Sequence, residues 1–147
     1  MCDDFVCFDS SNYPLIDITL KGKITDIDDV NMFINNWELC YDNNNPKKFI
    51  FIINTLQYIP SLYDLKYTRK LLRFISKIKE KMIFEKKYSK LDKSIIIVNS
   101  NITRHLLKMI FSIQTPLSTI YIVESVENAT ILYNNFIHNI ECNLTNE

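Results

Sequence analysis

Three short apolar runs decide the fold of this chain: Phe49-Ile50-Phe51-Ile52-Ile53, Ser94-Ile95-Ile96-Ile97-Val98 and Thr119-Ile120-Tyr121-Ile122-Val123. Each run is rich in β-branched or aromatic residues and is bounded by polar or turn residues. Continuous apolarity, as opposed to alternation, is typical of strands buried on both faces of a parallel sheet. We therefore predict three neighbouring strands, sheltered from water by helices on their flanks.

The residues before these runs predict two further strands. Ile16-Asp17-Ile18-Thr19-Leu20-Lys21 alternates between apolar and polar side chains, which indicates a strand with one solvated face near a sheet edge. Residues 4–8 predict a short edge strand that forms a hairpin with it.

Four segments between and after the strands repeat apolar residues at spacings of three and four, which is typical of amphipathic helices. The segments cover residues 27–41, 65–82, 102–113 and 129–140, with Ser61, Ser100 and Ser125 as N-caps of the last three. The resulting order, β-β-α-β-α-β-α-β-α, predicts one α/β domain over residues 1–147, with a mixed, mainly parallel five-stranded sheet and about four helices. We expect less order in residues 1–13 and 141–147.

Composition narrows the class of protein. The chain has 147 residues, of which 47% are hydrophobic, and this suits one packed domain. No N-terminal signal and no membrane-length apolar run is visible, so we expect a soluble cytoplasmic protein. The four cysteines form no C-x-x-C pair, which argues against zinc and favours reduced thiols. They are Cys2, Cys7, Cys40 and Cys142.

The chain lacks the patterns that mark common enzymes. Its only glycine is Gly22, and a phosphate-binding loop, a dinucleotide-binding turn and a nucleophile elbow all need more than one. His105 has no carboxylate or cysteine at a ligand spacing, and His138 sits next to the apolar stripe of the last predicted helix, so both are expected to be ordinary helix residues. We therefore predict no enzymatic activity, no metal and no cofactor, although a site assembled from residues distant in sequence stays open as an alternative.

Charge is unevenly spread along a chain whose net charge is zero. Residues 1–46 carry nine acidic and two basic residues, whereas residues 66–93 carry eleven basic and three acidic ones. Five bases at spacings of three and four form a stripe along the second helix, which predicts attraction to an anionic surface; the alternative is an ordinary solvated face. Nucleic acid is disfavoured because aromatic residues for base stacking are not interleaved. The basic stripe consists of Lys66, Lys70, Arg73, Lys77 and Lys81.

Polar residues also cluster where the predicted parallel strands end. Ligands of such sheets tend to bind beyond the carboxyl ends of the strands, and Ser61 would sit at a helix N-terminus that favours phosphate. The alternative is that Ser61 and its counterparts only cap helices. The predicted ligand or phosphorylation region consists of Thr55, Tyr58, Ser61, Asn99 and Ser125.

At this junction the sequence resembles the STAS domain family, the fold of anti-sigma factor antagonists and of sulfate-transporter tails. The resemblance covers roughly residues 14–138 and lies in the order of elements. It rests on Lys21-Gly22-Lys23-Ile24, on Tyr58-Ile59-Pro60-Ser61 and on the run from Ile120 to Ala129.

The resemblance implies a non-catalytic domain that binds other proteins. In the family, an Asp-Ser-(Ser/Thr)-Gly turn carries a phosphorylated serine, and Ser61 occupies the matching position. Pro60 replaces the aspartate, and Leu62 and Tyr63 stand where a hydroxyl residue and the glycine are expected, which puts phosphorylation at Ser61 in doubt. We expect a protein partner near Ser61, with a small anionic ligand and a homodimer as open alternatives, and binding to phospholipid or nucleic acid through residues 66–81 as the competing function.

Overall fold

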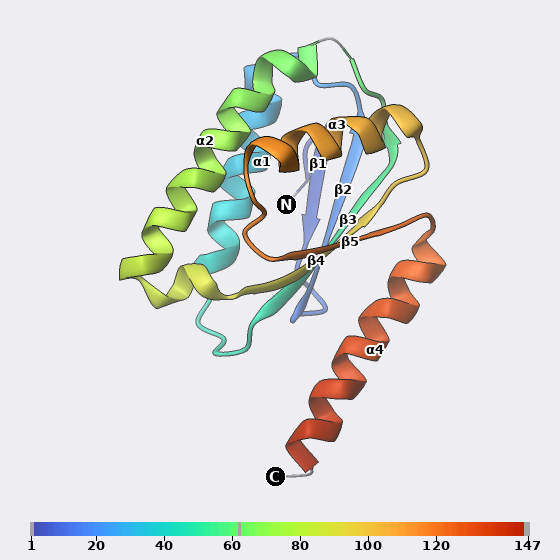
Figure 1. Cartoon of the computed structure of the whole chain (residues 1–147). Helices are drawn as coiled ribbons and strands as arrows, with labels where there is room; N and C mark the ends of the chain where they lie inside the picture. The colour runs from blue at the N-terminus through green and yellow to red at the C-terminus, as the bar shows by residue number, and fades with distance from the viewer. Residues whose placement is uncertain (1, 62, 146–147) are drawn as a thin grey trace.

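The computed structural model describes residues 2–61 and 63–145 and contains one five-stranded sheet (Figure 1). The strands are β1 (Val6–Asp9), β2 (Leu15–Gly22), β3 (Phe49–Tyr58), β4 (Leu91–Ile97) and β5 (Thr119–Val123), and they lie in the order β1-β2-β3-β4-β5. β1 pairs antiparallel with β2, and every later pair is parallel. The predicted mixed, mainly parallel α/β sheet is confirmed, as is the hairpin of the first two strands.

Helices cover the sheet unequally on its two faces. Helices α1 (Ile27–Leu39), α2 (Tyr63–Phe84) and α3 (Asn101–Ile113) lie on one face, and α4 (Val126–Thr145) lies on the other (Figure 1). Two short 3₁₀ turns complete the chain, η1 (Cys40–Asp42) after α1 and η2 (Lys86–Ser89) after α2. We call the two sides of the sheet the three-helix face and the α4 face.

The three-helix face is packed with aromatic rings. Phe49 and Phe51 of β3 point to this side, and the indole ring of Trp37 on α1 lies 5.6 Å from the Phe51 ring and 5.3 Å from that of Phe74 on α2. Edge-on contacts of this kind add stabilisation beyond the burial of area. Ile75 and Ile78 complete the buried side of α2.

The α4 face is packed with aliphatic side chains. Ile50 and Ile52 of β3 alternate with the phenylalanines and point to this side, where they meet Ile95 and Ile97 of β4. Ala129 of α4 is fully buried against them, so the small side chain lets the helix backbone approach the sheet closely. Leu132, Tyr133 and Phe136 extend the contact along α4.

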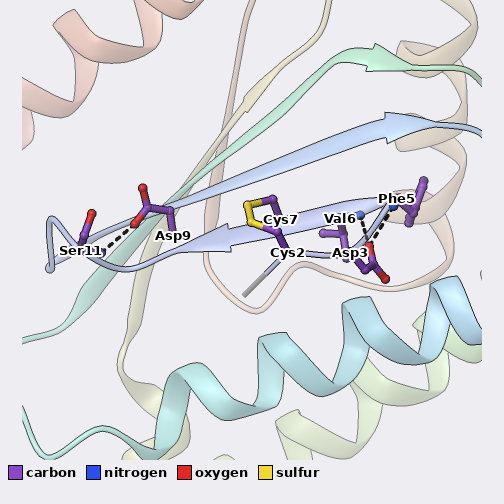
Figure 2. The surroundings of a disulfide bond; sticks show 7 residues. All are labelled: Cys2, Asp3, Phe5, Val6, Cys7, Asp9 and Ser11. Carbon is purple, nitrogen blue, oxygen red and sulfur yellow. Dashed lines mark hydrogen bonds between the residues drawn. A yellow bond between two sulfur atoms is a disulfide. The ribbon is translucent and has the colours of Figure 1, made fainter.

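The N-terminal segment folds back on β1 and is held by a disulfide between Cys2 and Cys7 (Figure 2). The carboxylate of Asp3 accepts hydrogen bonds from the backbone N–H groups of Phe5 and Val6, at 2.9 and 2.6 Å, and turns the chain between the two cysteines. The expectation of reduced thiols is therefore wrong for this pair, because the turn brings together cysteines that the sequence keeps five residues apart. Cys40 is free, and the side chain of Cys142 lies outside the described part of the chain.

The strands and the loop after α2 also depart from the predictions. β3 continues to Tyr58, five residues beyond the apolar run, because it pairs with β2 as far as Gly22. β5 is half exposed as the outer strand of the sheet, so the prediction that all three runs are buried on both faces is wrong for β5. The lysines at 86, 87 and 90 predict that residues 84–92 form a mobile basic loop. In the structure this segment contains the η2 turn, and Tyr88 is buried in the core.

Candidate functional site

The carboxyl end of β3 carries two of the predicted site residues, and both face inward. Thr55 is buried, and its hydroxyl donates a 2.6 Å hydrogen bond to the backbone carbonyl of Ile97 on β4. Tyr58 is half-buried at the last position of the strand, and its hydroxyl donates to the carboxylate of Asp64. The two side chains therefore fix the strand end to its surroundings and do not project into solvent.

Asp64 is the centre of the junction between β3 and α2. It is only 4% exposed, and its carboxylate accepts from the Tyr58 hydroxyl and, at 2.8 Å, from the backbone N–H of Ser61. The backbone N–H of Asp64 in turn donates to the Ser61 carbonyl at 3.1 Å. This reciprocal pair resembles half of a capping box, in which an acidic side chain three residues into the helix satisfies the N–H of the cap.

The neighbourhood of Asp64 changes the acidity of Tyr58. Burial, the hydrogen bond to Asp64 and the negative charge of Asp64 together raise the pKa of the Tyr58 hydroxyl well above its usual range. Tyr58 therefore stays protonated and acts as a permanent hydrogen-bond donor, which suits a structural link better than acid–base chemistry.

Sequence reasoning missed Asp64. The signal was present as Ser61-x-x-Asp64, the spacing of a capping box directly before an apolar run. The sequence predicts that the Ser61 side chain caps α2. In the structure the Asp64 carboxylate caps the backbone N–H of Ser61 instead, and the Ser61 hydroxyl lies 3.5 Å from the second carboxylate oxygen of Asp64.

A surface hollow of about 450 Å³ opens beside Ser61, between the N-terminal ends of α2 and α3. Its rim is apolar: Leu65 of α2 is 56% exposed and Ile102 of α3 is 67% exposed. His105 of α3 adds an exposed imidazole to the lining. We call this region the Ser61 surface; it comprises Pro60, Ser61, Leu65, Ile102, His105 and Met109.

The other two predicted site residues lie at the ends of neighbouring strands but do not line this hollow. Asn99 is exposed after β4, next to Ser100, whose hydroxyl accepts from the backbone N–H of Thr103 at 3.4 Å and caps α3. The hydroxyl of Ser125 accepts from the backbone N–H of Asn128 at 3.1 Å and caps α4. The structure therefore brings Tyr58 and Ser61 together on Asp64, ties Thr55 to β4, and gives Ser125 a capping role.

The basic stripe lies on α2 opposite the buried face, as the helical spacing predicts. The positive charge of its last member, Lys81, is paired within the protein. The ammonium group lies 2.9 Å from the carboxylate of Glu38 on α1 and 5.0 Å from the ring centre of Tyr88. The hydrogen bond to Glu38 is the main reason that the pKa of Lys81 is raised. Within the described residues, no acidic side chain forms an ion pair with Lys66, Lys70, Arg73 or Lys77.

Comparisons with known proteins add no relative to this picture. A scan against protein-family models, a search of curated proteins and a search of solved structures each found no match to this chain. In the part of the chain that the structure describes, no helix has the length and apolarity needed to cross a bilayer. Across the same residues, no group of three or more His, Cys, Asp or Glu side chains is arranged to hold a metal ion.

Proposed function

We propose that this protein is a non-catalytic interaction domain that resembles a stand-alone STAS domain and binds a protein partner through the Ser61 surface. The order of elements along the chain and the order of strands in the sheet support the resemblance. The observation that carries the proposal is the apolar rim of the hollow beside Ser61. Apolar side chains that stay exposed around a concavity are typical of protein-binding sites.

Asp64 favours a protein over a small anion as the ligand. The N-terminal end of a helix attracts negative charge, but here the Asp64 carboxylate already accepts the backbone N–H of Ser61. A free phosphate at this position would meet that carboxylate at close range. An apolar protein surface meets no such repulsion.

The same carboxylate gives Ser61 a route to control binding. The Ser61 hydroxyl lies 3.5 Å from Asp64, so a phosphoryl group on it would place its negative charge against a buried carboxylate. Repulsion would displace Asp64 and release its bonds to Ser61 and Tyr58, thereby loosening the first turn of α2. Modification of Ser61 would therefore weaken binding by changing the shape of the hollow.

The test is affinity capture with quantitative mass spectrometry on the wild-type protein, Ser61→Asp and Leu65→Asp. Ser76→Asp is the matched control because Ser76 is an exposed serine elsewhere on α2. We expect a partner that is recovered equally by wild type and Ser76→Asp and is at least tenfold depleted with both other variants, which corresponds to about 1.4 kcal/mol of lost affinity. Equal recovery with all four proteins would contradict the proposal.

A second candidate function, binding to an anionic membrane surface, is favoured by the end of α2. Ile83 is 77% exposed and Phe84 is 86% exposed, at the end of the helix that carries the basic stripe. Basic residues that attract anionic lipid, next to apolar residues that enter the bilayer interface, are typical of peripheral membrane helices. α2 lies along the outer side of the molecule, where it can reach such a surface (Figure 1).

Vesicle sedimentation distinguishes the two candidates. Phosphatidylcholine vesicles with phosphatidylserine should bind the wild-type protein at low salt, and binding should fall as salt is added. Charge reversal at Lys70 and Lys77 should weaken binding at least tenfold, since each basic residue near the surface contributes about 1 kcal/mol. The double reversal of Lys47 and Lys48, which are exposed in the loop before β3, is the charge-matched control. Vesicle binding that is unchanged both by added salt and by the charge reversal at Lys70 and Lys77 would exclude this function.

A further inference from the structure

The three-helix face is incompletely filled. A cavity of about 170 Å³ lies between the sheet and the helices that cover it. Its walls are apolar and come from both sides: Ile53, Ile96 and Ile120 from the strands, and Leu71, Leu107 and Ile110 from α2 and α3. An apolar cavity of roughly this size stays free of water and accepts a molecule as large as benzene.

One polar group in the cavity wall has no partner. Thr103 of α3 is 2% exposed, and its hydroxyl oxygen makes no hydrogen bond within the described part of the chain. Other hydroxyl groups in the cavity wall already have hydrogen-bond partners. The Thr55 hydroxyl donates to the Ile97 carbonyl, and the hydroxyls of Ser94 and Ser118 pair at 3.2 Å. A buried hydroxyl without a partner is unfavourable, so its persistence next to an open space points to a ligand that would complete it.

The charges around the cavity limit what that ligand is. Among the residues that the structure describes, no lysine, arginine or histidine lines the cavity, so these residues supply no cation to compensate a buried anion. Asp64 is the one charged residue in the described part of the lining, and its carboxylate already accepts from Tyr58 and Ser61. A carboxylate or phosphate ligand would be repelled by Asp64 and would lose its hydration, and a cationic ligand would have to displace the existing hydrogen bonds.

We infer that this cavity binds a small, uncharged and mainly apolar molecule about the size of a single aromatic ring, and that the Thr103 hydroxyl hydrogen-bonds its one polar atom. The site differs from the Ser61 surface, although Asp64 and Leu106 line both, because it lies between the sheet and the helices and holds a small molecule, whereas the Ser61 surface is an open hollow for a protein. Binding to purified protein therefore tests it without any protein partner.

Fluorine NMR titration with para-fluorophenol is the direct test, with fluorobenzene as the probe that lacks a hydroxyl and para-fluorobenzoate as the anionic probe. Wild-type protein should bind both neutral probes and should bind the benzoate at least tenfold more weakly. Thr103→Val keeps the shape of the side chain and removes its hydroxyl. This variant should weaken para-fluorophenol fivefold to tenfold and leave fluorobenzene unchanged, while Thr130→Val on the exposed side of α4 should change neither.

A second pair of measurements keeps the result decisive. Leu107→Trp should fill the cavity and abolish binding of both neutral probes, with circular dichroism used to confirm that the variant folds. If it does not fold, Thr103→Val still decides through its selective loss of para-fluorophenol binding, and an unchanged or raised melting temperature of the ligand-free variant shows that this loss does not come from unfolding. Failure of wild-type protein to bind either neutral probe at millimolar concentration would overturn the inference, as would equal binding of the benzoate.

Discussion

The two faces of the sheet are built from the same strands and yet are packed in different ways. Along β3, Phe49 and Phe51 point toward three helices, whereas Ile50 and Ile52 point toward α4 alone. The three-helix face has a cluster of large rings, an unpaired hydroxyl at Thr103 and an open cavity, whereas the α4 face has a buried centre of isoleucines packed around Ala129. The difference indicates that burial alone does not make a face tight, since three helices leave a cavity over the sheet, whereas the small side chain of Ala129 lets α4 sit closely against it.

Phe51→Ala should have the largest effect on this comparison. The Phe51 ring is fully buried and contacts the rings of Phe8 and Trp37, so its removal joins a new void to a face that already contains one. We expect a loss of about 3–5 kcal/mol in the free energy of unfolding, measured by urea denaturation. Phe84→Ala removes the same groups from an exposed position and should change stability by less than about 0.5 kcal/mol. Similar losses for the two variants would show that the ring cluster is not the core of this face.

Ala129→Leu tests how tightly the α4 face is closed. Ala129 is fully buried against the isoleucines of β3 and β4, so the added atoms have no space and should lift α4 from the sheet. We expect a loss of about 1–3 kcal/mol from overpacking. Ile131→Leu, on the exposed side of the same helix, is the control and should be close to neutral. A neutral result at Ala129 would mean that the α4 face also has free space.

Asp17→Asn should have the smallest effect, and its sign depends on pH. Asp17 lies opposite Asp9 in the β1–β2 pair, and its pKa is raised above the ordinary 3.8 by burial and then by the Asp9 charge. Below pH 3.8 the carboxyl is protonated in both the folded and the unfolded protein. As the pH rises above this value, the unfolded protein ionises first, so stability falls until the folded protein has also ionised.

The Asp17→Asn protein has no carboxyl group at this position, so its stability does not show this fall as the pH rises. Its melting temperature should exceed that of wild type at neutral pH, and the difference should shrink as the pH approaches 3.8 from above. The exposed Asp4→Asn variant removes an equal charge and serves as the control. A difference between Asp17→Asn and wild type that is the same at acidic and neutral pH would show that the effect arises from packing and not from ionisation.

The sequence predicts the sheet and its caps well because these depend on local patterns. Continuous isoleucine runs identify β3 and β4, and the hydroxyls of Ser100 and Ser125 cap the helices that follow β4 and β5, as expected. The prediction fails where distant or reciprocal contacts decide. The role of Asp64 depends on Tyr58 and Ser61 being brought to it by the turn. The cavity is the space left between side chains that come from several strands and helices, which no local pattern records.

The strands lie side by side in the same order as they occur in the chain. During synthesis, each new strand can therefore pair at once with the strand made before it. Such a sheet can grow outward from its N-terminal hairpin as the polypeptide leaves the ribosome. The α4 face is the exception, since Ile95 and Ile97 are covered by α4, which follows all five strands along the chain. A nascent chain halted before residue 126 would display these isoleucines to water, and loss of the C-terminal segment should therefore lead to aggregation more readily than to a shorter working protein.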